Sequence, residues 1–270
     1  MALNQPCNKS CLNKCPVTSF YTKNIHMKKT YQILNILGFI GVLVMNYLAN
    51  ALPLGGRNTG EISDLYPSLF TPAPMTFAIW GLIYLLLAVF VVVQARDLFK
   101  EKQVPQDVVE AVGPWFFVNC LANMAWLLAW HHLMVGLAFA IIAGMLATLM
   151  IIYERLQIGR FQPPKLIKYG VHLPFSVYMG WLTVATIPNA SILLLEMQWE
   201  GFGIAPHYWT VYMLMVGTFL GLLLLFRRKD IAFASVLIWA FVGIYVAANN
   251  KGWPAIIAQS ALSFCILLAL

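Results

Sequence analysis

The chain has 270 residues, of which 61% are hydrophobic and only 10% are charged. A soluble domain carries about a quarter charged residues, so this composition excludes a soluble globular protein and indicates an integral membrane protein. The net charge of +7 comes from basic residues between apolar runs, and it therefore does not indicate nucleic-acid binding. Because hydrocarbon offers the backbone no hydrogen-bond partners and the apolar runs are continuous, we expect an all-α protein.

Residues 1–30 are polar and basic, and we expect them to form a disordered cytoplasmic tail. Cys7, Cys11 and Cys15 are evenly spaced within it. Three thiols could carry a lipid or bind a metal, but a zinc site takes four ligands and only His26 is nearby, so we expect no metal site. The stretch from Met27 also reads like the start of a membrane protein, and Met27 is an alternative to Met1 as the first residue.

Apolar runs of roughly 20 residues, the length that crosses a bilayer, then follow one another to the end of the chain. The eight runs lie at about 31–51, 76–95, 113–130, 134–153, 171–195, 208–226, 231–249 and 254–270. The sequence therefore predicts a polytopic membrane helix bundle of about eight transmembrane helices.

The distribution of basic residues between these runs predicts the topology. The N-terminal tail and the loops after the second, fourth and sixth runs hold fifteen of the 17 Lys and Arg residues, and the loops of the other parity hold only Arg57 and Lys251. Cytoplasmic loops carry the excess of Lys and Arg. We therefore expect a multi-pass protein of the cell membrane with its N-terminus and C-terminus in the cytoplasm.

The longest loop on the other side of the membrane is Leu52 to Pro74, which contains glycines and prolines but no apolar periodicity. A loop of this length in a compact bundle is usually a lid or a disordered segment. Pro72 and Pro74 then precede the second run. Proline is tolerated in the first turn of a helix, and here it would fix the rotation of the helix that follows.

Aromatic and amide side chains recur at helical spacing on one face of the second, third and fifth runs. These candidate ligand-binding residues are Trp80, Tyr84, Asn119, Asn123, Trp126, Tyr178, Trp181 and Asn189. An asparagine in the middle of a span must find its partners inside the protein. Two interpretations remain open: the amides join neighbouring helices, or they line an aromatic-walled cavity for a small molecule.

Other patterns carry weaker indications. Asn46 and Asn50 are also four residues apart in the first run, and Gly217 and Gly221 form a GxxxG pattern that would let another helix of the same chain approach closely. The adjacent residues His131 and His132 lie in a tight turn, where a solvated role is commoner than axial ligation of haem. No Walker loop, His–Glu cluster or Ser–His–Asp set is present in the sequence, and we nominate no catalytic residue and no metal ligand.

The stripes on the second, third and fifth runs together resemble the TspO/MBR family, whose members are called translocator proteins or tryptophan-rich sensory proteins. The family pattern in the second helix is a Pro-rich start and Trp-x-x-x-Tyr, matched here by Pro72, Pro74, Trp80 and Tyr84. In the third helix, Asn119 replaces the family's Gln ahead of Asn123 and Trp126. In the fifth, Tyr178, Trp181 and Asn189 match, but Val177 stands in place of a proline.

This resemblance implies a five-helix core over residues 31–200, with three additional helices over residues 201–270 and a ligand pocket under the 52–74 loop. It further implies a binding protein or carrier for a flat hydrophobic ligand, foremost a tetrapyrrole (porphyrin or haem) held without covalent attachment, and a possible homodimer. Two alternatives remain open. The chain could be an eight-helix transporter of an unrelated solute, or an enzyme that degrades porphyrins, although the sequence offers no dedicated redox site.

Overall fold

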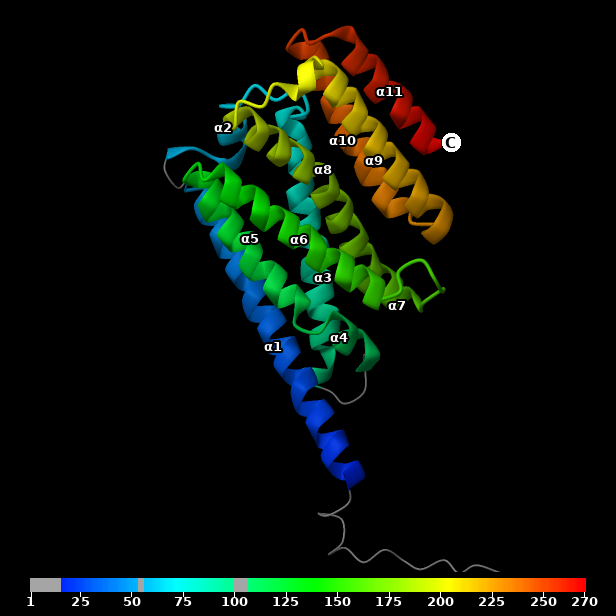
Figure 1. Ribbon diagram of the computed structural model, residues 1–270. Helices are drawn as coiled ribbons and strands as arrows, with labels where there is room; N and C mark the ends of the chain where they lie inside the picture. The colour runs from blue at the N-terminus through cyan, green and yellow to red at the C-terminus, as the bar shows by residue number, and fades with distance from the viewer. Residues whose placement is uncertain (1–15, 53–55, 100–105) are drawn as a thin grey trace, which may run out of the picture.

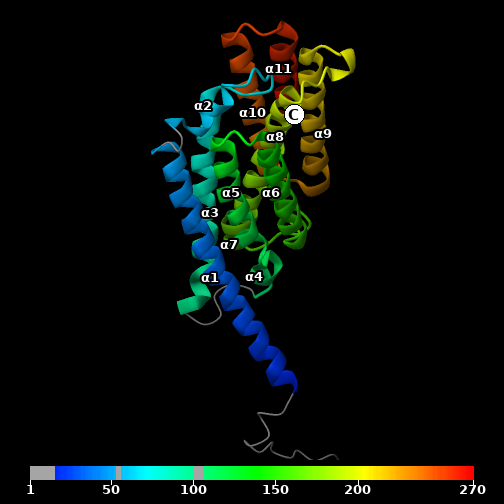
Figure 2. The same ribbon diagram turned by 60° about the vertical axis from the view of Figure 1, so that its left-hand side comes forward.

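The computed structural model describes residues 16–52, 56–99 and 106–270, and within these ranges the chain forms helices and no strands. The predicted all-α class is therefore confirmed. The helices pack into one elongated bundle, with α1 along one side and α9 to α11 grouped on the other (Figures 1 and 2).

Each of the eight predicted runs overlaps one long helix. These helices are α1 (Pro16–Asn50), α3 (Ile79–Phe99), α5 (Trp115–His131), α6 (Val135–Arg155), α8 (Leu173–Glu196), α9 (Pro206–Arg228), α10 (Ile231–Asn250) and α11 (Ala255–Ala269). The shorter elements are α2 (Thr59–Ser63), α4 (Gln106–Val112), α7 (Lys165–Ile167), a π-helical turn (Lys168–His172) and two 3₁₀ turns (Pro74–Ala78 and Gly201–Gly203).

Six helical stretches of the described part are long and apolar enough to cross a membrane: 27–50, 74–96, 135–155, 165–196, 206–228 and 231–250. The helices α5 and α11 are shorter, with 17 and 15 residues. Large apolar side chains such as Leu85, Val92 and Phe219 are exposed on the outside of the bundle, where lipid would cover them. The chain is thus a multi-pass membrane protein, as predicted.

The first helix is longer than expected. It begins at Pro16, so the predicted disorder is wrong for residues 16–30. Residues 1–15, with Cys7, Cys11 and Cys15, lie outside the described ranges. No glycine or proline occurs between Val17 and Leu37, and extending an existing helix costs far less than starting one.

The packing order places α8 at the centre of the bundle. The helix α5 packs between α1 and α6, and α8 contacts α3, α6 and α10 (Figure 1). A Cβ added at Gly217 would lie 3.1 Å from the Phe241 ring, and one at Gly221 would lie 2.7 Å from Leu237. The GxxxG pattern therefore serves close packing of α9 on α10 within the chain.

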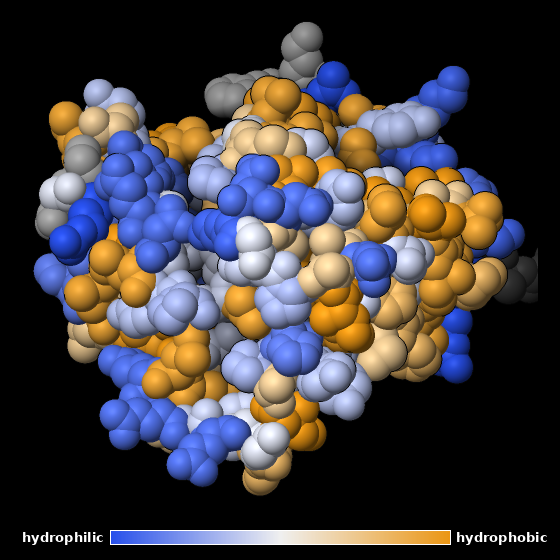
Figure 3. Space-filling model, turned by 90° about the horizontal axis from the view of Figure 1, so that it is seen from above, coloured by the Kyte–Doolittle hydropathy of each residue, from blue (hydrophilic) through white to orange (hydrophobic). Residues whose placement is uncertain are grey.

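Loops of alternating parity lie at opposite ends of the bundle. The helix α2 and the turn between α10 and α11 are at the upper end in Figure 1, where Lys251 Nζ lies 3.3 Å from Asp64 Oδ1. Seen from above, this end face carries hydrophilic side chains between hydrophobic ones (Figure 3). The segment from α6 to α7 is at the other end, which we call the basic end because most Lys and Arg residues of the sequence fall in its loops.

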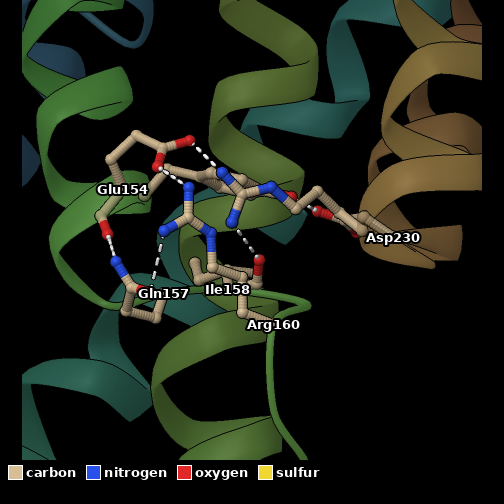
Figure 4. Close-up of polar contacts among 7 residues, drawn as sticks. Glu154, Gln157, Ile158, Arg160 and Asp230 are labelled. Atoms are coloured by element: carbon tan, nitrogen blue, oxygen red, sulfur yellow. Dashed lines mark hydrogen bonds and ion pairs between the residues drawn. The ribbon is translucent and has the colours of Figure 1, made fainter.

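At the basic end, Glu154 joins the end of α6 to its neighbours (Figure 4). Its carboxylate accepts a hydrogen bond of 3.0 Å from Arg160 and pairs with Arg228 at the end of α9. Arg228 also donates to the backbone oxygen of Ile158 over 3.4 Å. Gly159 makes this approach possible, because a Cβ there would lie 2.0 Å from the Arg228 carbonyl oxygen.

The buried carboxylate of Asp230 closes the same end from the inside. It accepts hydrogen bonds from the Phe233 N–H (3.0 Å), the Tyr153 hydroxyl (2.9 Å) and the Ser176 hydroxyl (2.7 Å). The first caps α10, and the other two come from α6 and α8. Because a buried carboxylate must be hydrogen-bonded, Asp230 fixes three helices relative to one another.

An amide cluster joins α1 and α3 in the half of each helix that points to the basic end. Asn35 Nδ2 donates to Gln94 Oε1 over 3.0 Å, and Gln94 Nε2 donates to the Gln32 backbone oxygen over 3.1 Å. The Gln32 side chain donates back to the Gln94 backbone oxygen. All three side chains are buried, so this half of the α1–α3 interface is closed.

Candidate functional site

Toward the α2 end, the same two helices border a cavity of about 290 Å³. Its walls come from α1, α2, the Pro74–Ala78 turn, α3 and α5, and all the lining residues are uncharged. Small-molecule sites are concave and mostly apolar with a few polar groups. The cavity has this character.

The polar part of the lining is a chain of amides. Asn46 Nδ2 of α1 donates to Asn123 Oδ1 of α5 over 3.3 Å, and Asn123 Nδ2 donates to the Tyr178 hydroxyl of α8 over 3.4 Å. Asn50, one turn after Asn46, also lines the cavity and donates to the Asn46 backbone oxygen over 3.1 Å. These groups can offer hydrogen bonds to a ligand without any net charge.

The apolar part consists mainly of stacked rings. Trp80 and Tyr84, one turn apart on α3, have centroids 5.6 Å apart and planes 21° apart. The Trp80 ring also meets Tyr178 and Trp181 edge to face, with centroids 6.1 and 6.2 Å away. The Phe77–Trp80–Tyr84 face of the second predicted run is therefore turned toward the interior and the cavity.

The helix α10 fixes the segment that leads into this face. The Ala73 N–H donates to the Gly243 oxygen over 3.0 Å, and Trp239 Nε1 donates to the Thr76 oxygen over 2.9 Å. A Cβ at Gly243 would lie 2.0 Å from Thr76 Oγ1, so only glycine permits this approach. The Pro-rich start of the second run is thus held by a helix more than 150 residues later in the chain.

A second stacked pair stands on α5. Trp126 and Trp130 have centroids 5.6 Å apart and planes 15° apart. Trp126 Nε1 donates to Asn189 Oδ1 of α8 over 3.3 Å, whereas Trp130 Nε1 donates to the Thr59 oxygen of α2 over 3.2 Å. The pair therefore joins the wall of the cavity to α2, which covers the cavity.

Residues 52–74, which the sequence left open as a lid or a disordered segment, cover the cavity and are partly folded. Asn58 and Glu61 form a reciprocal capping box at the start of α2, with bonds of 2.8 to 3.0 Å. Residues 53–55 lie outside the described ranges. Partial burial, with a smaller effect of the Glu196 carboxylate, raises the pKa of Tyr66 in this segment, and the Tyr66 ring lies 6.4 Å from the Trp130 ring between centroids.

A smaller hollow of about 40 Å³ adjoins the cavity on the side of α8. The two share Thr59, Phe77, Trp80 and Trp126 in their linings. Trp181 and Asn189 line only the smaller one.

The structure brings most of the sequence-derived candidates together. Trp80, Tyr84, Asn123 and Trp126 line the cavity, and Trp181 and Asn189 line the adjoining hollow. Tyr178 lies directly behind them, in contact with Trp80 and Asn123.

Asn119 is placed elsewhere. Its amide donates to the Met145 oxygen (3.0 Å) and to Thr148 Oγ1 (2.7 Å), both on α6, so it joins two helices and lines neither space.

Sequence reasoning did not nominate the residues that α1 and α2 contribute. The spacing of four residues indicated that Asn46 and Asn50 lie on one face of a helix, but the sequence did not show that this face of α1 turns toward the cavity. Asn58 and Glu61 spell the Asn-x-x-Glu pattern of a capping box, which could have placed the short helix that brings Thr59 and Gly60 to the cavity.

The histidine pair lies outside the cavity lining. Nδ1 of the buried His131 is 2.8 Å from the Leu127 oxygen, and its Nε2 is 3.2 Å from the Ala49 oxygen. Both ring nitrogens therefore lie within hydrogen-bonding distance of a backbone carbonyl oxygen, and a neutral ring donates to one of the two. His132 is exposed.

Comparison with known proteins gives one match. Residues 32–270 match the family model described as "TSPO-like protein", a range that includes all of α9 to α11. No curated protein and no solved structure matches the chain.

Proposed function

Because the chain belongs to the family of TSPO-like proteins, we propose that it is a membrane binding protein or carrier for a flat hydrophobic ligand, foremost a tetrapyrrole such as a porphyrin or haem. The single observation that carries this proposal is the uncharged cavity under α2, which is lined by the stacked Trp80 and Tyr84 of α3 and by Trp126 of α5. Aromatic rings gain from offset-stacked or edge-to-face contact with another ring system, which favours a planar ligand over a flexible one.

In the proposed complex, Trp80 and Trp126 supply facing walls, and Tyr84, Asn123 and Asn46 supply hydrogen bonds. The volume of about 290 Å³ is at the lower end of the range for small-molecule sites. A tetrapyrrole therefore requires the covering segment to move. The helix α2 has only five residues and is a suitable lid.

We also propose that the basic end faces the cytoplasm, because cytoplasmic loops carry the excess of Lys and Arg. The α2 end and its cavity would then open on the opposite side of the membrane.

The test is a titration of the detergent-solubilised protein with protoporphyrin IX, followed by quenching of tryptophan fluorescence. We expect saturable quenching in the wild type and an affinity about tenfold lower or worse in Trp80→Ala, since both ring contact and apolar burial are lost. Trp80→Phe, which keeps a ring, should lose less.

Trp199→Ala is the matched control, because Trp199 lies in the loop before α9, outside both spaces. Its affinity should equal that of the wild type. Size-exclusion profiles establish that each variant is folded. Absence of saturable quenching in the wild type, or equal affinity of wild type and Trp80→Ala, would contradict the proposal.

A further inference from the structure

Three buried polar atoms around the smaller hollow have no hydrogen-bond partner among the described residues. They are the indole nitrogen Nε1 of Trp181 and the hydroxyl oxygens of Thr59 and Thr71. Trp181 is 2% exposed and Thr71 is 3% exposed. All three residues line the same space of about 40 Å³, although they come from α8, α2 and the loop before the Pro74–Ala78 turn.

Unpartnered buried polar groups are uncommon in folded proteins, because each loses its hydrogen bonds to water without replacement. An indole N–H can only donate, and a hydroxyl can donate or accept. The group that would satisfy all three must therefore carry an acceptor. An oxygen atom with two lone pairs has this property.

The size and surroundings of the hollow restrict that group further. A cavity needs about 10–15 Å³ to hold a water molecule and about 150 Å³ to hold a benzene ring, so the hollow holds a small oxygen-bearing group and not a ring. No charged side chain lines it, which disfavours a carboxylate. Its wall shares Trp80 and Trp126 with the larger cavity, so a molecule in the cavity lies next to it.

We propose that the smaller hollow is a subsite for a neutral carbonyl oxygen of the ligand bound in the cavity. Trp181 Nε1 and one of the two threonine hydroxyls, Thr59 or Thr71, donate to the two lone pairs of this oxygen, and the remaining hydroxyl donates to the other hydroxyl. The inference rests on the proposed function only in that a flat molecule enters the cavity; it does not require a tetrapyrrole.

A pair of flat probes that differ by one carbonyl tests the subsite directly. These probes are 9-fluorenone and fluorene, titrated against the purified protein by fluorescence quenching. The wild type should bind 9-fluorenone about tenfold more tightly than fluorene, because an acceptor satisfies donors that fluorene leaves unpaired. Trp181→Phe, which keeps an aromatic ring but removes the N–H, should abolish this preference, so that the ratio of the two affinities falls to about one.

Trp209→Phe is the control for this pair, because its Nε1 donates to the Gly201 oxygen over 3.1 Å, away from the hollow. It should keep the preference for 9-fluorenone. Equal affinity of the wild type for the two probes, failure to bind either, or an unchanged preference in Trp181→Phe would overturn the subsite.

A measurement without ligand provides a second, independent arm. Thr71→Val replaces an unpaired hydroxyl by a methyl group of the same shape, and we expect it to raise the Tm of the ligand-free protein by about 2 °C. The control Thr218→Val removes an equally buried hydroxyl, which donates to the Leu214 oxygen over 2.8 Å, and it should not raise the Tm. An unchanged or lower Tm in Thr71→Val would show that its hydroxyl is already satisfied, for example by water, and would overturn the proposal.

The two proposals fail in different ways. Absence of protoporphyrin binding, together with a tenfold preference for 9-fluorenone, rejects the tetrapyrrole and retains the subsite. Saturable protoporphyrin binding with equal affinities for the two small probes rejects the subsite and retains the proposed function.

Discussion

The half of the α1–α3 interface that points to the basic end and the half that points to α2 both contain amide side chains, but these side chains do different things. In the first half, Gln32, Asn35 and Gln94 are buried and bond to one another across the two helices. In the second, Asn46 and Asn123 are 3.3 Å apart and border a cavity of about 290 Å³. An amide in a membrane span therefore does not by itself indicate a ligand site.

The residues around the amides also differ between the two halves. Stacked rings, Trp80 with Tyr84 and Trp126 with Trp130, lie beside the amides in the second half. The basic end is instead closed by charged groups, among them the Glu154–Arg228 pair and the buried Asp230. The cavity at one end is thus lined only by uncharged residues, whereas the other end contains the buried carboxylate of Asp230.

The largest expected effect is in a test of which end of the bundle faces the outside of the cell, because chemical labelling of a cysteine at each end should be all or none. In a chain whose five cysteines are changed to alanine, single cysteines are placed at the exposed positions Glu200 and Lys165. An impermeant maleimide added to intact cells should label Glu200→Cys and should reach Lys165→Cys only after lysis. The reverse result would place the cavity end in the cytoplasm.

Loss of an amide should lower the stability of the protein more in the half of the α1–α3 interface toward the basic end than in the half that borders the cavity. Gln94→Leu removes two side-chain hydrogen bonds and leaves the buried Asn35 amide without its acceptor, so we expect a loss of about 1–3 kcal/mol in the free energy of unfolding. Thermal denaturation in detergent measures it. Porphyrin affinity of the folded fraction should stay the same; a loss of affinity would mean that the two halves are coupled.

Asn123 and Asn119 allow the same comparison within one helix. Asn123→Leu removes a cavity amide, and we expect about a threefold to tenfold loss of porphyrin affinity with little change in Tm. Asn119→Leu removes the bonds to α6 and should lower the Tm with no change in affinity. If both variants changed the same quantity, the assignment of one amide to the site and the other to helix packing would be wrong.

The smallest expected effect is on the free energy of unfolding, from an exposed ion pair at the α2 end of the bundle. Lys251 and Asp64 are about half exposed, so Lys251→Ala should change the free energy of unfolding by less than about 0.5 kcal/mol. The effect should vanish at high salt, because exposed charge pairs are screened. A larger, salt-independent effect would indicate that this pair holds α2 in place.

Much of the architecture could be predicted because the signal is local. Continuous apolar runs placed all eight long helices, and helical spacing put Trp80, Trp126 and Trp181 on inward faces. The alternation of runs and loops predicted that Asp64 and Lys251, in two loops of the same parity, lie at the same end of the bundle, and their contact confirms it.

The parts that could not be predicted depend on neighbours that a single run does not reveal. Asn119 and Asn123 are only about 40° apart around α5, yet the first meets α6 and the second meets the cavity. The contribution of Asn46 depends on the rotation of α1, and the helical state of residues 16–30 depends on propagation from the apolar part of the same helix.

The contact between Gly243 and Thr76 has a thermodynamic consequence. Since α10 holds the segment that begins the Trp80 wall, melting of the last three helices would release that wall as well. Regions that share such a contact unfold as one cooperative unit. We therefore expect a single denaturation transition for the whole bundle, and a chain shortened after residue 200 would lose ligand affinity together with its helices.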